Sequence, residues 1–442
     1  MSTALFTALL LLCVSVHSTP EFNPQHHSGA ASPYFNAPSQ FGIPIDIPAQ
    51  CSVDQAAYIN IRAVPAASQN QGPLAFLPSW VPPVDDQPHE PLFLPSTGAR
   101  EAFDLGVKLR KLYGFTKGGE NMTQRVVDTA TYFAHGYLSQ GNYVSAPGEN
   151  RGTVVTMPDS VNFTFADSLT PSNGCPAYGG GDTSAKANTF RASYQGKIAA
   201  RLNQFLDGLV LDDSDVGIMQ DLCGFQAEIS GDTRFCDVFH PSEWEDYEYA
   251  DDLNYYYGSG PGNPFSATVG FPWVKAVTDL FVLGPNAAPV NSTFVPPSDH
   301  ELYRVYPLSV TAPDARRHFR SSYLVSFRGY VALEKLSCDR DGPPSVVLGP
   351  GRSADAEKFV PVRINNAPVP LSGCTSGPGS SCPLQSFAEY VERQRAAVAG
   401  DFVERCGLRG VSNATGVLDI FTEVPSRNAQ SSVLAVPLPY AS

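Results

Sequence analysis

Apolar positions along the chain predict both helices and strands. Between Gln124 and Leu138, Val, Ala and Tyr side chains recur at helical spacing, so this segment should form an amphipathic helix. A Ser/Thr start followed closely by a Glu predicts another helix over 96–113. A third helix is predicted over 185–209, with a buried stripe made of Ile198, Leu202, Phe205, Leu206 and Leu209.

Segments with the alternating pattern of strands are interleaved with these helices. Strand character is found at 153–157 and 322–336, and a hairpin is predicted over 359–371 with its turn at Asn365-Asn366. Further helices are expected near 273–281 and over 387–405. This alternation predicts an α/β fold.

The same pattern divides the chain into segments. A Pro- and Ser-rich stretch over 19–50 lacks periodicity and is expected to be an extended, partly disordered arm. An α/β domain should comprise 51–161 and 265–406, because the helical stretch 162–264 has the composition of an inserted helical domain. The last residues, 407–442, lose the pattern and are expected to form a loosely ordered tail.

Composition narrows the classes of function. The 442 residues are 43% hydrophobic, which permits a large core, and carry a formal net charge of −14 with a pI of about 5.0. Such an acidic chain is not expected to bind nucleic acid through a broad basic face. A few converging arginines could still bind a phosphate ester.

The N-terminus indicates secretion. Residues 5–16 form an apolar run that is too short to span a bilayer and is typical of a signal peptide, with cleavage expected near Ser18, so that 1–18 is removed. No Lys or Arg precedes this run. No other segment has the length of a membrane span, so the mature chain is predicted to be soluble and extracellular.

Cysteine usage agrees with secretion. Cys13 lies in the predicted signal peptide, and the remaining eight cysteines are an even number, which favours a disulfide framework. Two local bridges are natural from proximity, Cys223–Cys236 and Cys374–Cys382, whereas spacing leaves the pairing of the other four open. A zinc site is disfavoured, because the chain has no Cys-x-x-Cys pair with nearby histidines, and no cofactor is expected.

Four Asn-x-Ser/Thr sequons mark predicted glycosylation sites on the surface. They lie at Asn121, Asn162, Asn291 and Asn413.

The segment 221–265 carries a family resemblance. It reads Asp-Leu-Cys-Gly-Phe, then Arg-Phe-Cys-Asp-Val-Phe from Arg234, and ends Tyr-Tyr-Tyr-Gly-Ser-Gly-Pro-Gly-Asn-Pro-Phe. This segment resembles the middle of a fungal histidine acid phosphatase, the branch that includes the phytases, and similarity extends from about Cys51 to Cys406. The resemblance implies a phosphoglycerate-mutase-like α/β core with a helical insertion domain and an active site between them. It also implies that the first strand, after Cys51, joins a parallel sheet through crossover connections. It also implies two long-range bridges, Cys51–Cys338 and Cys175–Cys406.

The resemblance implies a chemistry as well. In that family the histidine of an Arg-His-Gly-x-Arg-x-Pro motif attacks phosphorus, a later arginine clamps the phosphate, and a His-Asp pair supplies a donor and the general acid. The segment Gln124-Arg-Val-Val-Asp-Thr-Ala matches the arginine motif, which gives Arg125 the phosphate-binding role. The segment Pro-Pro-Ser-Asp-His places Asp299 at the general-acid position, with Ser298 where the histidine is expected. His300 is interpreted as an exposed loop histidine.

The nucleophile itself is missing from this chain. After the lead-in that ends at Ile59, where Arg-His-Gly should follow, the sequence reads Asn-Ile-Arg-Ala-Val-Pro, and no histidine occurs between His27 and His89. Arg62 is best interpreted as a solvated loop arginine. Two explanations stay open: a chain unable to form a phosphohistidine, or a sequence from which short coding pieces were removed at the motifs.

Two functions follow from the resemblance. One is a secreted acid phosphatase or phytase-like phosphomonoesterase, impaired as written, which acts on small phosphate monoesters with phytate as one candidate. The alternative is a non-catalytic, phosphate-binding or structural remnant of the same fold. A wall-associated carbohydrate-binding module would rest only on secretion, sequons and aromatic residues.

Overall fold

The computed structural model describes residues 22–46, 48, 51–57, 72–80, 96–113, 124–139, 172, 174–179, 184–206, 210–283, 317–327, 329–338 and 356–411. The helices are α1 (Ser96–Tyr113), α2 (Gln124–Leu138), α3 (Ala185–Leu202), α4 (Asp213–Ser230), α5 (Pro241–Gly258), α6 (Ser266–Leu283), α7 (Ser321–Leu324), α8 (Leu384–Gln394) and α9 (Phe402–Arg405). The strands are β1 (Cys51–Ala57), β2 (Val331–Cys338), β3 (Glu357–Val360), β4 (Val362–Ile364), β5 (Ala367–Val369) and β6 (Cys382–Pro383).

Strand β2 is the centre of the described sheet. β1 pairs with one edge of β2, and β3 and β4 pair with the C-terminal and N-terminal halves of its other edge. β3 and β4 are separated only by Pro361, which lacks the amide hydrogen that a continuous ladder needs. β5 then pairs with β4, and β6 with β3.

All pairs between the described strands are antiparallel, so the expected parallel arrangement is wrong for this part of the sheet. One reason is local. β4 and β5 are joined by the two-residue turn Asn365-Asn366, and so short a connection permits only antiparallel pairing. Both asparagines have positive φ values, 45° and 70°, which is the geometry of the hairpin turn predicted from the sequence.

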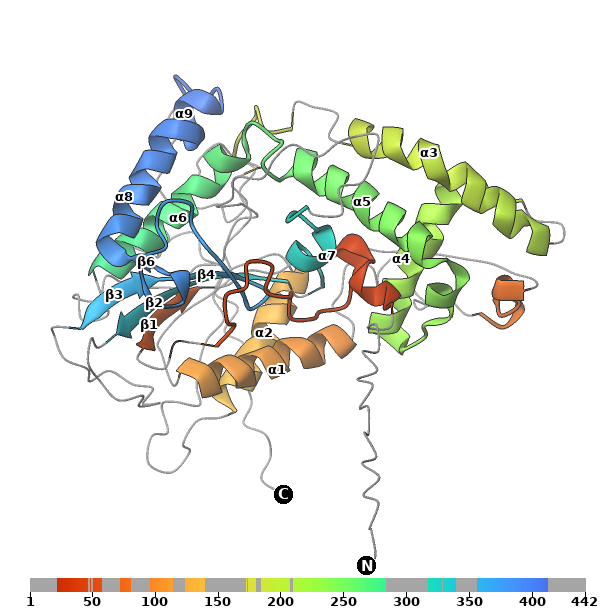
Figure 1. Cartoon of the computed structure of the whole chain (residues 1–442), viewed down its shortest axis with the longest axis horizontal. Coiled ribbons are helices and arrows are strands. Elements are labelled where there is room, and N and C mark those ends of the chain that lie inside the picture. Colours follow the sequence, from red (N-terminus) through yellow and green to blue (C-terminus); the bar gives the residue numbers. More distant parts are fainter. Residues whose placement is uncertain are drawn as a thin grey trace, which may run out of the picture.

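Helices cover the sheet on two sides. In Figure 1, α6 and α8 lie above the sheet, and α1 and α2 lie below it. The core between the sheet and the upper helices contains Leu333 of β2, Val362 of β4, Trp273 and Phe281 of α6, and Phe387 of α8. The arrangement is the expected mixed α/β fold.

Helices α3, α4 and α5 form a separate cluster to one side of the sheet (Figure 1). Its core includes Ile198 and Leu202 of α3, Leu222 of α4 and the fully buried Trp244 and Tyr249 of α5. The aromatic side chains of α5 therefore serve packing. α3 itself ends at Leu202, and a 3-10 turn over Asn203–Phe205 continues it, so the predicted helix to residue 209 was too long.

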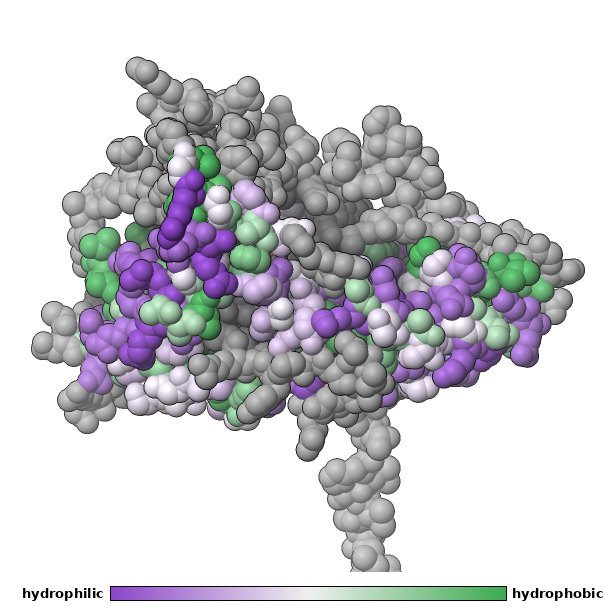
Figure 2. Space-filling view, turned by 90° about the horizontal axis from the view of Figure 1, so that it is seen from above, coloured by the Kyte–Doolittle hydropathy of each residue, from purple (hydrophilic) through white to green (hydrophobic). Residues whose placement is uncertain are grey.

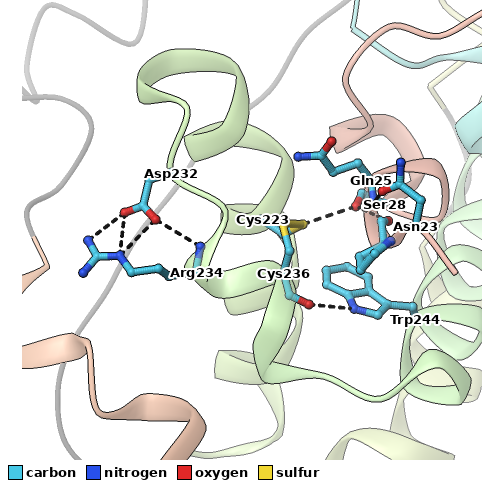
Figure 3. The surroundings of a disulfide bond; sticks show 9 residues. Asn23, Gln25, Ser28, Cys223, Asp232, Arg234, Cys236 and Trp244 are labelled. Atoms are coloured by element: carbon cyan, nitrogen blue, oxygen red, sulfur yellow. Dashed lines mark hydrogen bonds and ion pairs between the residues drawn. A yellow bond between two sulfur atoms is a disulfide. The ribbon is translucent and has the colours of Figure 1, made fainter. Parts of the chain in front are cut away.

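The N-terminal arm differs from its prediction. Its described part, 22–46, contains two short 3-10 turns, and Ser28, Ala31 and Ser32 are buried. Ser28 lies beside the Cys223–Cys236 disulfide, with its Oγ 3.8 Å from Cys223 Sγ (Figure 3). The described part of the arm is therefore packed against the fold.

Disulfides link distant segments. Cys175 bonds to Cys406 across 231 residues, and Cys223–Cys236 and Cys374–Cys382 are local, matching three expected pairs. Cys338 is also disulfide-bonded, and the residue opposite it in the β1–β2 register is Cys51.

Other predictions were partly right. α1 and α2 coincide with the helices expected over 96–113 and 124–138, and α6 contains the helix expected near 273–281. The strand expected over 322–336 is instead the short helix α7 followed by β2, and the aromatic residues Phe327 and Tyr330 before Val331 are buried outside any strand. The late helix is α8, a π-helical turn and α9, interrupted by Gly400 at φ 67°.

Several expectations fall outside the described residues, including the signal peptide, the strand at 153–157 and the tail beyond residue 411. Of that tail, Leu408 is described and buried. Within the part of the chain that the structure describes, no helix is long and apolar enough to cross a membrane. Figure 2 shows mainly hydrophilic residues on the described surface of one face, with apolar residues in small separate groups.

Candidate active site

Close packing of α1 on α2 fixes the helix that carries Arg125. A Cβ added to Gly106 of α1 would lie 2.1 Å from the Phe133 carbonyl oxygen, and one added to Gly136 of α2 would lie 1.9 Å from that of Phe103. Only glycine permits the two backbones to approach this closely. The direction of α2 is therefore set by a glycine contact on each helix.

Arg125 is the second residue of α2. The first four amide groups of a helix have no partner within the helix and, together with the helix dipole, favour an anion. The backbone position of Arg125 suits the phosphate role that the resemblance implies. Its side chain lies outside the described part.

The other residues predicted for the site are also outside the described residues. These are Asp299, the neighbouring Ser298 and His300, and Arg62. The four sequons lie outside the described residues as well. The structure therefore does not test whether Arg125 and Asp299 meet.

Five histidines lie in the described part of the chain, and their positions and contacts differ. His26 stacks on Phe35 and His318 on Phe41, at centroid distances of 4.1 and 4.9 Å. His27 contacts Glu248, and His240 precedes α5 as its N-cap residue. His135 lies on α2, ten residues after Arg125, which corresponds to about 15 Å along the helix axis.

A buried ionic cluster joins α5 to the segment that leads into α7. Arg317 Nη2 and Arg320 Nη1 donate to Glu248 Oε2 at 3.0 and 2.8 Å, and Arg317 Nε donates to Asp252 Oδ2. Ser321 Oγ donates to the other Asp252 oxygen at 2.7 Å. Because both guanidinium groups are engaged by carboxylates, this cluster orders the fold and is a poor candidate for phosphate binding.

Burial shifts the pKa values of the carboxyl groups on α5. Burial raises the pKa of Asp252 to about 6, although the Arg317 charge opposes it. Asp251 is raised by burial to a pKa of about 7, although a hydrogen bond from Ala30 opposes it. Burial also disfavours the Glu248 carboxylate, but His27, Arg320 and Arg317 together hold its pKa below the usual value.

Sequence reasoning missed this cluster. A signal was present, because residues 248, 251 and 252 stand at helical spacing within a segment rich in aromatic side chains. Acidic residues on a buried helix face require partners. The run Arg-Arg-His-Phe-Arg over 316–320 could have been proposed as that partner.

The described residues contain no group of three or more His, Cys, Asp or Glu side chains placed to hold a metal ion.

Comparison with known proteins shows which proteins this chain is similar to. Residues 56–306 match the family model of the histidine phosphatase superfamily, branch 2. The chain is 28% identical over 332 residues to an acid phosphatase of Komagataella pastoris, covering 71% of this chain and 66% of that protein. It is 26% identical over 433 residues to a phytase of Candida albicans, covering 88% of each.

Solved structures agree on the fold. The crystal structure of the phytase from D. castellii superposes with a TM-score of 0.76 at 22% sequence identity and covers 94% of each chain. The family model covers more than half of the chain, including α1 to α6 and the segment that carries Arg125 and Asp299. The chain therefore belongs to branch 2 of the histidine phosphatase superfamily.

Proposed function

We propose that this chain is a secreted protein of the acid phosphatase and phytase type that binds small phosphate monoesters but does not turn them over at a detectable rate. The family match supports the phosphomonoesterase class. The observation that carries the impairment is the absence of any histidine between His27 and His89, where the attacking residue belongs by resemblance. The N-terminal apolar run and the disulfides support an oxidising, extracellular location.

The chemistry explains why one missing residue matters. In a covalent mechanism a histidine nitrogen forms the bond to phosphorus while the bond to the leaving oxygen breaks, and the general acid protonates that oxygen. Water then attacks the phosphohistidine and releases phosphate. Asp299 would supply the proton and Arg125 would hold the phosphate, so an acidic pH optimum is expected wherever turnover occurs. Without the imidazole the first bond cannot form.

The test is hydrolysis of p-nitrophenyl phosphate at acidic pH by the purified chain. We expect no turnover above background. A comparison variant carries an Arg-His-Gly-x-Arg-x-Pro segment after Ile59 together with Ser298→His, and its matched control has Ala in place of the inserted histidine. Removal of a covalent nucleophile in a protease costs roughly 10⁶-fold in kcat, so a difference of several orders of magnitude is expected between these two variants. Turnover by the unmodified chain would contradict the proposal.

The second candidate function is a purely structural remnant of the fold, which the absence of the nucleophile favours. Phosphate binding distinguishes this remnant from a protein that still binds its phosphate ligand. Calorimetric titration with inorganic phosphate should show binding that Arg125→Ala weakens by about 10- to 100-fold, since a hydrogen bond to a charged group contributes about 1.5–3 kcal/mol. Arg100→Ala, at an exposed position of α1, is the control and should bind normally. An Arg125→Ala variant with unchanged affinity would favour the structural remnant.

Sequencing the transcript across the junctions at 59–60, 123–124 and 297–306 separates the two origins of the gaps. A transcript that encodes Arg-His-Gly and a histidine before Asp299 would identify the natural protein as an intact phosphatase.

A further inference from the structure

The N-terminal arm lies with its backbone directly on α4 and α5. A Cβ added to Gly224 of α4 would lie 1.6 Å from the Ala31 carbonyl oxygen. A Cβ added to Gly29, which has a φ of +54°, would lie 2.1 Å from Asp251 Oδ2 of α5. The 3-10 turn Gly29–Ala31 therefore covers the Asp251 carboxyl group, and the Ala30 amide donates to Asp251 Oδ2 at 2.6 Å.

The surroundings of Asp251 contain more acids than bases. Asp221 of α4 and Asp252 of α5 disfavour its ionisation, and Arg191 of α3 favours it. The neutral phenols Tyr194 of α3 and Tyr247 of α5 also lie near it. Asp252 is already engaged by Arg317 and Ser321. A second negative charge under the arm is therefore poorly compensated.

We propose that Asp251 makes the seat of the N-terminal arm pH-dependent: the turn Gly29–Ala31 is held on α5 at acidic pH and is released when the Asp251 carboxyl group ionises. Covering a neutral carboxyl group costs little, whereas covering a carboxylate removes its hydration. The hydrogen bond from Ala30 favours the carboxylate, but burial is the larger influence on Asp251.

The direction follows from linkage. The pKa of Asp251 is raised from 3.8 to about 7 in the packed arrangement, so the contribution of the packed arm is complete below about pH 4 and is lost as the pH rises towards 7. When the arm lifts, Asp251 meets water and ionises at its usual pH. Ionisation of Asp251 therefore shifts the equilibrium towards the released arm.

Other ionisable groups of the arm act on the same contact. His27 Nδ1 lies 3.4 Å from Glu248 Oε2, and this contact is an ion pair only when the imidazole is protonated. His26 acts in the opposite direction to Asp251, because burial and the neighbouring His27 lower its pKa and acid then favours release. The proposal requires the effect of Asp251 ionisation on the arm to exceed that of His26 protonation. His26 is half-buried, and its stacking partner Phe35 belongs to the arm itself.

The test is hydrogen exchange of the full chain followed by mass spectrometry, with rates corrected for the intrinsic effect of pH. Protection of peptides from 24–34 should fall by about tenfold or more between pH 5 and pH 8. Protection of α8 should change much less. Asp251→Asn keeps the size and an acceptor for Ala30 while removing the charge, so its arm should stay protected at both pH values. Glu245→Gln, an exposed carboxyl on the same helix, should behave as the unmodified chain.

Two results would overturn the proposal. One is an arm equally protected at pH 5 and pH 8 in the unmodified chain. The other is an Asp251→Asn variant that keeps the full pH dependence. If Asp251→Asn does not fold, His27→Gln serves instead: release at pH 8 must persist in that variant, and its loss would assign the effect to His27.

Discussion

Replacing Arg317 by Met should destabilise the protein in a pH-dependent way. Arg317 bridges two carboxylates of α5, and the side chains of Arg317, Glu248 and Asp252 are 5%, 1% and 0% exposed. Met keeps an apolar stem similar to that of Arg, but it lacks the guanidinium group, whose central carbon lies 4.9 Å from the centroid of the Tyr249 ring. The substitution therefore removes mainly the charge and its hydrogen bonds.

The expected cost follows from the partners that remain. Breaking a buried ion pair by removing one partner typically costs about 3–5 kcal/mol. Glu248 keeps Arg320 at 2.8 Å and the contact with His27, and Asp252 keeps the hydroxyl of Ser321 at 2.7 Å. We therefore expect the lower end of that range, about 3 kcal/mol in the free energy of unfolding at pH 7.5.

The cost should shrink in acid. The pKa of Asp252 is raised from 3.8 to about 6, so the stability linked to this group is complete below about pH 4 and falls as the pH rises to 6. Without Arg317 the pKa of Asp252 rises further, and the loss continues to higher pH. At pH 4.5 Asp252 is protonated in both proteins, and the expected difference falls to about 1–2 kcal/mol, from Glu248 and lost packing.

Urea denaturation followed by tryptophan fluorescence at pH 4.5 and 7.5 measures both values. Arg395→Met is the control, because Arg395 is 55% exposed and pairs with Glu392 on the surface, where such pairs contribute about 0–1 kcal/mol. A cost for Arg317→Met below 1 kcal/mol at pH 7.5, or an equal cost at the two pH values, would refute the reasoning.

Two further predictions concern packing and disulfides. Gly136→Ala should lower stability by about 1–3 kcal/mol, because its Cβ would collide with the Phe103 carbonyl, whereas Gly179→Ala, with no atom within 4 Å, should be nearly neutral; thermal denaturation compares them. Replacing Cys175 and Cys406 by Ser should cost about 5 kcal/mol by the loop-entropy relation, and replacing Cys374 and Cys382 about half as much, since the loops span 231 and 8 residues. Equal costs in urea denaturation would contradict that relation for this chain.

Local patterns were sufficient for much of the fold. The helices α1 and α2 and the Asn365-Asn366 turn could be predicted because helical periodicity and turn chemistry are encoded within a few residues. The strand expected over 322–336 failed because the same residue types also pack in loops and short helices. Pairing directions in the sheet could not be derived, since β1 and β2 are separated by more than 270 residues.

Less of the functional picture could be derived from residues alone. The family motifs gave Arg125 and Asp299 their roles, but those assignments stay predictions because neither side chain is described. The ionic cluster was missed because it depends on Arg317 reaching α5 across 65 residues, which no local pattern encodes. The packing of the arm was not predicted for the same reason: its residues Gly29 and Ala30 contact Asp251, which is distant in the sequence.

The Cys175–Cys406 bridge has a consequence for biosynthesis. A ribosome adds about 5–20 residues per second, so the 231 residues that separate the two thiols take about 12–46 s to emerge. Cys223 and Cys236, only 13 residues apart, are both available within about 1–3 s of each other. During about half of translation the nascent chain therefore carries Cys175 without its native partner Cys406, while an oxidised Cys223–Cys236 pair can already exist. An oxidoreductase that acts before Cys406 emerges can join Cys175 to another cysteine of the chain. Such a non-native disulfide must then be isomerised to reach the native pairing.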